Sequence, residues 1–266
     1  MDILFSFAGF DATGGAGVML DLKVFHALGF YGMALPSGLT IQNTRSVKGR
    51  FSPPPEFLLR QYLSLTDDVD FAGIKIGMLG STLNLSLLER IISEHQAVPI
   101  VVDPVFQSSS GAWLIERGSL SDFMDCIAGR INLLTPNLTE AARMTGKTIE
   151  TPSDMEEASR KIHHLLGVPV LLKGGHLPGM PKDILFDGSN LTVLEKKRLD
   201  VKVHGTGCFL SAAALAFLAR GMSLAAACRF AGDLIHKSLK KALSLGKGQS
   251  LLAIGIDTPR AHTHKP

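Results

Sequence analysis

The sequence predicts a three-layer α/β fold in which helices cover both faces of a mostly parallel central sheet. Short apolar runs alternate with helical patterns along the chain, which indicates repeated strand–helix units. Several runs are apolar at nearly every position, as expected of parallel strands that are covered on both faces. No linker, low-complexity run or internal repeat interrupts the alternation, so we expect one domain over residues 1–266, with a frayed tail at 258–266.

The apolar runs give the expected strands, and the stretches of helical periodicity between them give the helices. Strands are expected at residues 3–7, 31–39, 71–78, 100–105, 131–135 and 168–172, followed by a hairpin of 184–186 and 191–194. Helices are expected at residues 18–28, 56–65, 82–94, 138–145, 153–166, 208–220 and 224–245. Ligands of such sheets bind at the carboxyl ends of the strands, so a site is expected along that edge.

Composition and charge argue against several classes of protein. The chain carries 27 basic and 24 acidic residues and a net charge of +3, a near-balance that argues against binding to nucleic acid or to a membrane surface. No segment reads as a targeting signal, and the longest apolar stretch is too short to span a bilayer. Three widely spaced cysteines give neither a disulfide framework nor a zinc site, which favours a reducing, cytoplasmic location.

One glycine-rich turn, HGTGC at residues 204–208, precedes an almost entirely apolar helix. Backbone N–H groups of Gly205, Thr206 and Gly207 at a helix N-terminus can bind an anion and stabilise a phosphoryl group during transfer. The helix dipole is expected to lower the pKa of the Cys208 thiol, which would let Cys208 act as a general base toward a substrate hydroxyl. A plain helix-capping turn with a buried cysteine is the alternative.

A second glycine-rich turn, DATGGAG at residues 11–17, follows the first strand. Its glycines permit close approach of the backbone to a ligand, and Asp11 and Thr13 are candidate helix caps. The turn matches neither the Walker A pattern nor the dinucleotide pattern, and no Walker A sequence occurs in the chain. Bound ATP would therefore have to be held by another arrangement.

Polar residues also follow three buried strands. Asn137 and Glu140 open a helix, where they either form a capping pair or face the site and hold Mg²⁺, directly or through water. Asp103 ends a strand and is a second candidate for Mg²⁺, although a strand-end turn would also explain it. Lys173 precedes two glycines and can neutralise ATP phosphates; the alternative is a solvated lysine at a strand end.

Taken together in this order, these segments resemble the hydroxymethylpyrimidine/phosphomethylpyrimidine kinases of thiamine biosynthesis, which belong to the ribokinase-like superfamily. The matching segments span most of the chain: AGFDATGGAG (8–17), DLKVFHALGFYG (21–32), IQNTRSV (41–47), KIGML (75–79), VVDPV (101–105), LLTPNLTEA (133–141), LLKGGH (171–176) and HGTGC (204–208). The resemblance implies a ribokinase-like fold. It also implies ATP- and Mg²⁺-dependent phosphorylation of the hydroxymethyl group of 4-amino-5-hydroxymethyl-2-methylpyrimidine and of its monophosphate.

The resemblance also implies roles for single residues. Cys208 would be the activating base, beside an anion hole formed by the amides of residues 205–207. The remaining roles are substrate binding for Gly9, Asp11, Gln42, Met78 and Val105, ATP binding for Lys173, Asn137, Glu140 and His204, and metal binding for Asp103, Asn137 and Glu140. The carboxamide of Gln42 offers an acceptor and a donor side by side, which matches the amino group and ring nitrogen of an aminopyrimidine; a polar loop after the second strand is the alternative. Relatives are often dimers, so a homodimer is expected.

Three departures from the family pattern bear on substrate choice. Residues 106–111 read FQSSSG where relatives often carry a lysine, Phe209 replaces the usual threonine, and the glycine-rich end of the family is blurred around residues 246–248. A pyridoxal or pyridoxine kinase is an alternative, since those substrates also carry a hydroxymethyl group on a flat aza-aromatic ring. A catalytically silent pyrimidine-binding module is a more distant alternative, against which the retained Cys208, Lys173 and Glu140 argue.

Overall fold

The computed structural model describes residues 1–106, 120–175, 177 and 179–255. Within these residues, nine strands form one sheet in the order β3-β2-β1-β4-β5-β6-β7-β8-β9. The pairings from β2 through β7 are parallel, whereas β3, β8 and β9 are added antiparallel at the two edges. The strands are β1 (Ile3–Phe10), β2 (Tyr31–Gln42), β3 (Val47–Phe51), β4 (Gly73–Ile76), β5 (Ile100–Val102), β6 (Leu133–Leu134), β7 (Val170–Lys173), β8 (Lys182–Phe186) and β9 (Leu191–Glu195).

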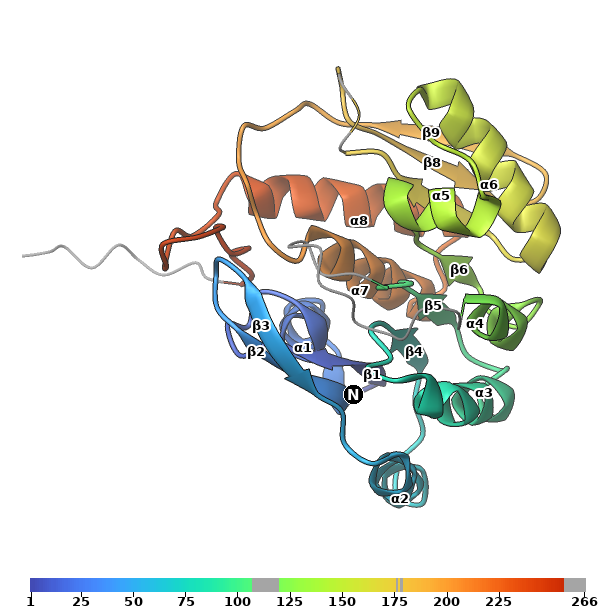
Figure 1. The fold of residues 1–266 in the computed structure, drawn as a ribbon, viewed down its shortest axis with the longest axis vertical. Helices are drawn as coiled ribbons and strands as arrows, with labels where there is room; N and C mark the ends of the chain where they lie inside the picture. Colours follow the sequence, from blue (N-terminus) through green and yellow to red (C-terminus); the bar gives the residue numbers. More distant parts are fainter. Residues whose placement is uncertain (107–119, 176, 178, 256–266) are drawn as a thin grey trace, which may run out of the picture.

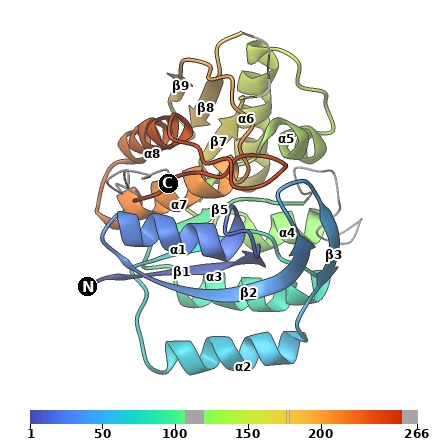
Figure 2. The ribbon, with the colours of Figure 1, turned by 90° about the vertical axis from the view of Figure 1, so that its left-hand side faces the viewer.

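Helices cover both faces of this sheet (Figures 1 and 2). One face packs against α2 (Pro55–Thr66), α3 (Leu85–Glu94), α4 (Leu120–Ile127), α5 (Leu138–Thr145) and α6 (Pro152–Leu166), with a short 3₁₀ turn at Thr82–Asn84 before α3. The other face packs against α1 (Gly17–Ala27), α7 (Thr206–Ala219) and α8 (Leu224–Leu239). Among the described residues, no helix has the length and apolar character needed to cross a membrane.

Alternation along the central strands explains the two apolar layers. Ile100 and Val102 of β5 lie in the cluster with α2 to α6, whereas Val101 between them lies in the cluster with α1, α7 and α8. Because successive side chains of a strand point to opposite faces, a strand covered on both sides has no position left for a solvated side chain. The α7 helix is apolar on all sides for the same reason, since it is enclosed by the sheet, α1 and α8.

The predicted fold class is confirmed, but some elements differ from the prediction. β3 and α4 were not predicted, and the second strand was predicted to end at 39, whereas β2 continues to Gln42. No residue of β3 is buried and most are exposed, so β3 lacks the apolar run that marked the central strands. The last helix ends at Leu239 and not at 245. The extension of β2 matters for the site because it places Gln42 on a strand, where the polar-loop alternative put it in a loop.

Candidate active site

The polar residues expected at the carboxyl ends of the strands do meet along one edge of the sheet. Lys173, the last residue of β7, donates to Asp103, which follows β5, with 2.6 Å between Nζ and Oδ1. Thr135, which follows β6, donates to the same carboxylate oxygen over 3.2 Å. The Asp103 side chain is 2% exposed and that of Lys173 is 14% exposed. The ion pair and Thr135 therefore hold the Asp103 carboxylate through Oδ1, and the Lys173 side chain stays partly accessible.

The first turn of α7 lies directly against this ion pair. Gly205 caps the helix with φ 80°, a left-handed conformation, and a Cβ there would lie 1.8 Å from the carbonyl oxygen of Gly15. A Cβ on Gly207 would lie 3.0 Å from Lys173 Nζ and 3.6 Å from Asp103 Oδ2. Glycine at these two positions thus permits the two glycine-rich turns to pack together and the helix N-terminus to approach Lys173. Helix N–H groups beside an ammonium form a site for a phosphoryl group or another anion.

Cys208 lies in the first turn of α7 and is half-buried. The prediction that its thiol pKa is lowered was wrong: burial raises the pKa of Cys208 to about 11. The Lys75 ammonium and a hydrogen bond from the Gly17 backbone both favour the thiolate, but they do not overcome the loss of hydration. In the ligand-free protein the sulfur is therefore protonated at neutral pH.

Asn137 and Glu140 form the predicted capping box at the start of α5. Asn137 Oδ1 accepts from the Glu140 backbone N–H over 2.9 Å, and Glu140 Oε2 accepts from the Asn137 backbone N–H over 2.7 Å. Glu140 is also buried, which raises its pKa to about 7 against the attraction of Lys173. The carboxyl groups of Asp103 and Glu140 both interact electrostatically with the Lys173 ammonium. The capping residues therefore belong to the same charged corner as Lys173.

This corner was also the predicted Mg²⁺ site. No group of three or more His, Cys, Asp or Glu side chains arranged to hold a metal occurs among the described residues. Mg²⁺, however, keeps several waters and is usually held by one or two carboxylates together with phosphate oxygens. The two buried carboxyl groups of Asp103 and Glu140 fit that requirement, while Asn137 contributes an oxygen that already accepts from a backbone N–H.

Gly9 and Met78, two of the residues predicted to line a substrate pocket, lie together at the end of β1. A Cβ on Gly9 would lie 2.5 Å from Met78 Cε, so these two residues are in close contact where the β1–β2 register shifts. Val105 is half-buried, and its backbone N–H donates to the Asp103 carbonyl over 2.8 Å. The loop after Val105 begins with Phe106, which is buried edge-to-face against Phe123; residues 107–111 of the altered loop lie outside the described residues.

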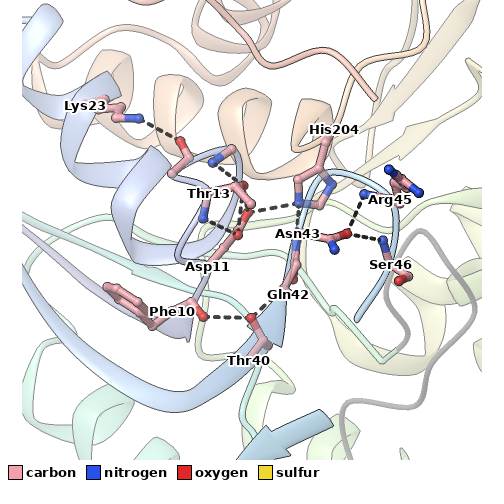
Figure 3. Close-up of polar contacts among 12 residues, drawn as sticks. Phe10, Asp11, Thr13, Lys23, Thr40, Gln42, Asn43, Arg45, Ser46 and His204 are labelled. Atoms are coloured by element: carbon pink, nitrogen blue, oxygen red, sulfur yellow. Dashed lines mark hydrogen bonds and ion pairs between the residues drawn. The ribbon is translucent and has the colours of Figure 1, made fainter. Parts of the chain in front are cut away.

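His204, predicted to bind ATP, joins two residues predicted to bind the substrate (Figure 3). Its Nε2 lies 3.1 Å from Asp11 Oδ2 and 2.9 Å from Gln42 Nε2. Asp11 also accepts from the backbone and the hydroxyl of Thr13 over 2.9 and 2.8 Å. The prediction that Asp11 and Thr13 cap the following helix was wrong, because α1 begins after Ala16 and has no side-chain cap. The Asp11 carboxylate instead faces His204.

Sequence reasoning missed a buried ion pair beneath the site. Lys75 Nζ lies 2.8 and 3.0 Å from the two carboxylate oxygens of Asp21, and Ser6 Oγ donates to Asp21 over 2.7 Å. All three residues are fully buried. Burial disfavours the Lys75 ammonium, but the Asp21 carboxylate outweighs it and raises the pKa of Lys75. A lysine inside the apolar strand β4 was the available signal, since a buried charge requires a partner.

Two departures from the family pattern have structural explanations. Phe209 is 1% exposed and belongs to the apolar cluster under α7, so it acts in packing. Around residues 246–248, the Gly248 N–H donates to Thr44 Oγ1 over 3.1 Å, and the Gln249 N–H donates to the Thr44 carbonyl over 2.8 Å. This segment therefore holds the loop that follows Gln42.

The family model and the relatives that match this chain point to the same kinase family. A family model described as phosphomethylpyrimidine kinase matches residues 11–253. The hydroxymethylpyrimidine/phosphomethylpyrimidine kinase of Aquifex aeolicus is 34% identical over 94% of this chain and 99% of its own length. A thiamine biosynthesis bifunctional protein of Geobacter sulfurreducens is 39% identical over 91% of this chain, which spans only 50% of that longer protein.

Solved structures of two kinases also match this chain. The ADP complex of Bacillus subtilis pyridoxal kinase matches with a TM-score of 0.85 and 29% identity, covering 96% of this chain and 97% of that one. Phosphomethylpyrimidine kinase from Clostridium difficile matches with a TM-score of 0.78 and 30% identity, covering 89% and 99%. These matches confirm the predicted ribokinase-like fold over nearly the whole chain.

Proposed function

Because this chain belongs to the phosphomethylpyrimidine kinase family, we propose that it transfers the γ-phosphoryl group of ATP to a pyrimidine alcohol in thiamine biosynthesis. The acceptor is the hydroxymethyl group of 4-amino-5-hydroxymethyl-2-methylpyrimidine, and its monophosphate is the acceptor of a second transfer. The observation that carries this proposal is the approach of the α7 N-terminus to Lys173, where a Cβ on Gly207 would lie 3.0 Å from Lys173 Nζ.

Electrostatics supply most of the proposed catalysis. Phosphoryl transfer passes through a loose transition state with charge on the equatorial oxygens, so positioned donors matter more than covalent chemistry. The N–H groups of residues 205–207 and the Lys173 ammonium stabilise that charge. Cys208 receives the proton of the substrate hydroxyl. Since the pKa of Cys208 is about 11, little thiolate exists at neutral pH, and we place its contribution near the lower limit for a general base, roughly 10²-fold.

The charged corner also supports use of Mg²⁺. Asp103 and Glu140 would hold the ion, with Asn137 as a further oxygen donor, and the bound ion would neutralise phosphate oxygens of ATP. Glu140 suits this role because its buried carboxyl has a pKa of about 7 and so exchanges a proton for a cation near neutrality. Titration of the ligand-free protein with Mg²⁺ should release protons, and a Glu140→Gln variant should release fewer.

Pyridoxal phosphorylation is the second candidate, favoured by the structural match to Bacillus subtilis pyridoxal kinase. An ADP-release assay with the pyrimidine alcohol, its monophosphate and pyridoxal side by side distinguishes the two candidate functions. We expect the highest kcat/KM with the pyrimidine alcohol. Turnover of pyridoxal alone would favour the second candidate. Thermal stabilisation by the pyrimidine without ADP release from any acceptor would indicate a silent binding module.

A homodimer through the outer face of β2 and β3 completes the proposal. Leu39, Ile41 and Phe51 lie on one face of this pair and are 39%, 67% and 59% exposed. Thr40 and Gln42, which alternate with Leu39 and Ile41 along β2, face the site. An exposed apolar stripe beside an edge strand is suited to burial against a second copy. Sedimentation should show a dimer in the wild type and a shift toward monomer in an Ile41→Lys variant.

A further inference from the structure

The side chain of His204 links the two glycine-rich turns to Gln42 through one ring nitrogen (Figure 3). Nε2 lies 3.1 Å from Asp11 Oδ2 and 2.9 Å from the Gln42 carboxamide. Asp11 is 4% exposed, and burial alone would raise its pKa. Hydrogen bonds from His204 and Thr13 outweigh burial and hold the pKa of Asp11 below its ordinary value. An ionised carboxylate only accepts hydrogen bonds, so Nε2 must carry the ring proton, and this one hydrogen lies between Asp11 and Gln42.

A protonated Nε2 places a requirement on the Gln42 carboxamide. Because a ring N–H cannot accept a hydrogen bond, the group 2.9 Å away must be an acceptor, which in Gln42 is Oε1. A carboxamide presents its oxygen and its amino group on opposite sides, and the surrounding network decides which side faces which partner. The structure has the carboxamide nitrogen 2.9 Å from His204 and the oxygen 3.2 Å from Thr40 Oγ1. The charge on Asp11 assigns the reverse orientation, with Oε1 toward His204 and the amino group toward Thr40.

The hydrogen bonds of the Thr40 hydroxyl support the same orientation of the Gln42 carboxamide. Its hydroxyl carries one hydrogen, which it donates to the Phe10 carbonyl over 3.0 Å. The hydroxyl oxygen then has lone pairs left for the Gln42 amino group. With the opposite orientation, one hydroxyl hydrogen would face two acceptors, and the amino group of Gln42 would face the N–H of His204. In this orientation no two donors face each other, and the single Nε2 hydrogen of His204 is shared between Asp11 Oδ2 and Gln42 Oε1.

We propose that Asp11 and His204 are positioning residues that fix the direction of the Gln42 carboxamide and thereby set the substrate specificity of the kinase. The inference rests on the proposed function, in which Gln42 contacts the pyrimidine ring. With its two anchors in place, Gln42 has one lone pair and one N–H left to offer, in a fixed order. An aminopyrimidine presents an amino group next to a ring nitrogen and matches that order. Pyridoxal has no amino group beside its ring nitrogen and leaves a polar group unpaired.

Steady-state kinetics of a His204→Phe variant test the proposal. We expect the ratio of kcat/KM for the pyrimidine alcohol to kcat/KM for pyridoxal to fall about 10- to 100-fold, mostly through KM for the pyrimidine. A His204→Gln variant keeps an N–H near the position of Nε2 and should recover most of the ratio. His164→Phe, at an exposed position on α6, is the matched control and should leave it unchanged.

A double variant separates positioning from a general effect on folding. If His204 acts through Gln42, adding His204→Phe to Gln42→Leu should change the ratio no further, whereas independent effects would multiply. The inference would be overturned if His204→Phe kept the wild-type ratio of the two kcat/KM values. It would also be overturned if the losses of the two single variants multiplied in the double variant. Either result would leave the proposed function intact. A wild-type protein that turns over no pyrimidine alcohol would overturn both.

Whether His204 Nε2 carries a proton can be measured without turnover, by ¹⁵N-edited NMR of labelled histidine. We expect the Nε2 of His204 to be protonated at neutral pH in the ligand-free protein, and its signal to move in an Asp11→Asn variant. An unprotonated Nε2 would remove the reason for the carboxamide direction and contradict the inference.

Discussion

Two lysine–aspartate pairs lie close to the reacting corner, and they differ in their access to solvent. Lys75 and Asp21 approach to 2.8 Å with both side chains 0% exposed. Lys173 and Asp103 approach to 2.6 Å, but the Lys173 side chain is 14% exposed beside the first turn of α7. Both ammonium groups interact electrostatically with Cys208. Buried charge therefore does not by itself mark a site. We assign the enclosed pair to stability and the accessible pair to catalysis.

The largest effect is expected from a substitution that breaks the enclosed Lys75–Asp21 pair. A Lys75→Met substitution leaves the Asp21 carboxylate buried without its cation and should lower the free energy of unfolding by about 3–5 kcal/mol, measured by urea denaturation. A double Lys75→Met and Asp21→Asn variant removes both charges and should recover a large part of the loss. A single variant as stable as the wild type would show that Lys75 does not have the stabilising role assigned to it.

The second prediction concerns a substitution that breaks the accessible Lys173–Asp103 pair. A Lys173→Met substitution removes the cation nearest the helix N-terminus, and kcat should fall about 10³-fold, as when one preorganised donor is lost. Lys182→Met is the matched control, because Lys182 forms an exposed pair with Glu195 and should leave kcat unchanged. If Lys173→Met kept more than a third of wild-type kcat in single-turnover and steady-state assays, the assignment of this pair to catalysis would be wrong.

The third prediction concerns Glu140 beside the accessible pair. Its folded-state pKa of about 7 lies above the ordinary value of 4.5, so folding favours the protonated carboxyl. This stabilisation is fully present below pH 4.5 and is lost as pH rises through 7, by roughly 3 kcal/mol in total. Unfolding free energies measured from pH 4.5 to 8 should show that loss in the wild type and not in Glu140→Gln. Equal pH dependence in both proteins would contradict it.

The smallest predicted effect concerns Cys208, which both ammonium groups influence. Cys208→Ala should lower kcat roughly 10²-fold, while Cys126→Ala, a change at a half-buried cysteine on α4, should leave kcat unchanged. Because the thiol pKa of Cys208 is about 11, the base form becomes more abundant as pH rises. Wild-type kcat/KM should therefore increase from pH 7 toward pH 10, and the alanine variant should lack that increase. A shared pH profile would show that Cys208 is not the base.

Local sequence patterns predicted the fold well because buried parallel strands have a local signature. The apolar runs around β1, β5 and β7 marked the central sheet, and the polar residues that end those strands marked the edge where Asp103 and Lys173 meet. β3 escaped prediction because its residues, most of them exposed, show no apolar run. Its existence depends on pairing with β2 and not on its own composition.

The relations within the site were harder to predict because they join distant segments. His204 contacts Asp11 across 193 positions and Gln42 across 162, and no local pattern reports either contact. The pKa of Cys208 was predicted in the wrong direction for a related reason. The helix dipole can be read from the sequence, whereas the burial that outweighs it depends on how α1, α7 and the sheet pack.

The central claim is that phosphoryl transfer occurs at the first turn of α7, and a crystal structure of the protein with a non-hydrolysable ATP analogue tests it most directly. We predict that the terminal phosphate accepts hydrogen bonds from backbone N–H groups of residues 205–207 and from Lys173 Nζ. A terminal phosphate bound elsewhere, out of reach of both the α7 N-terminus and Lys173, would contradict the account.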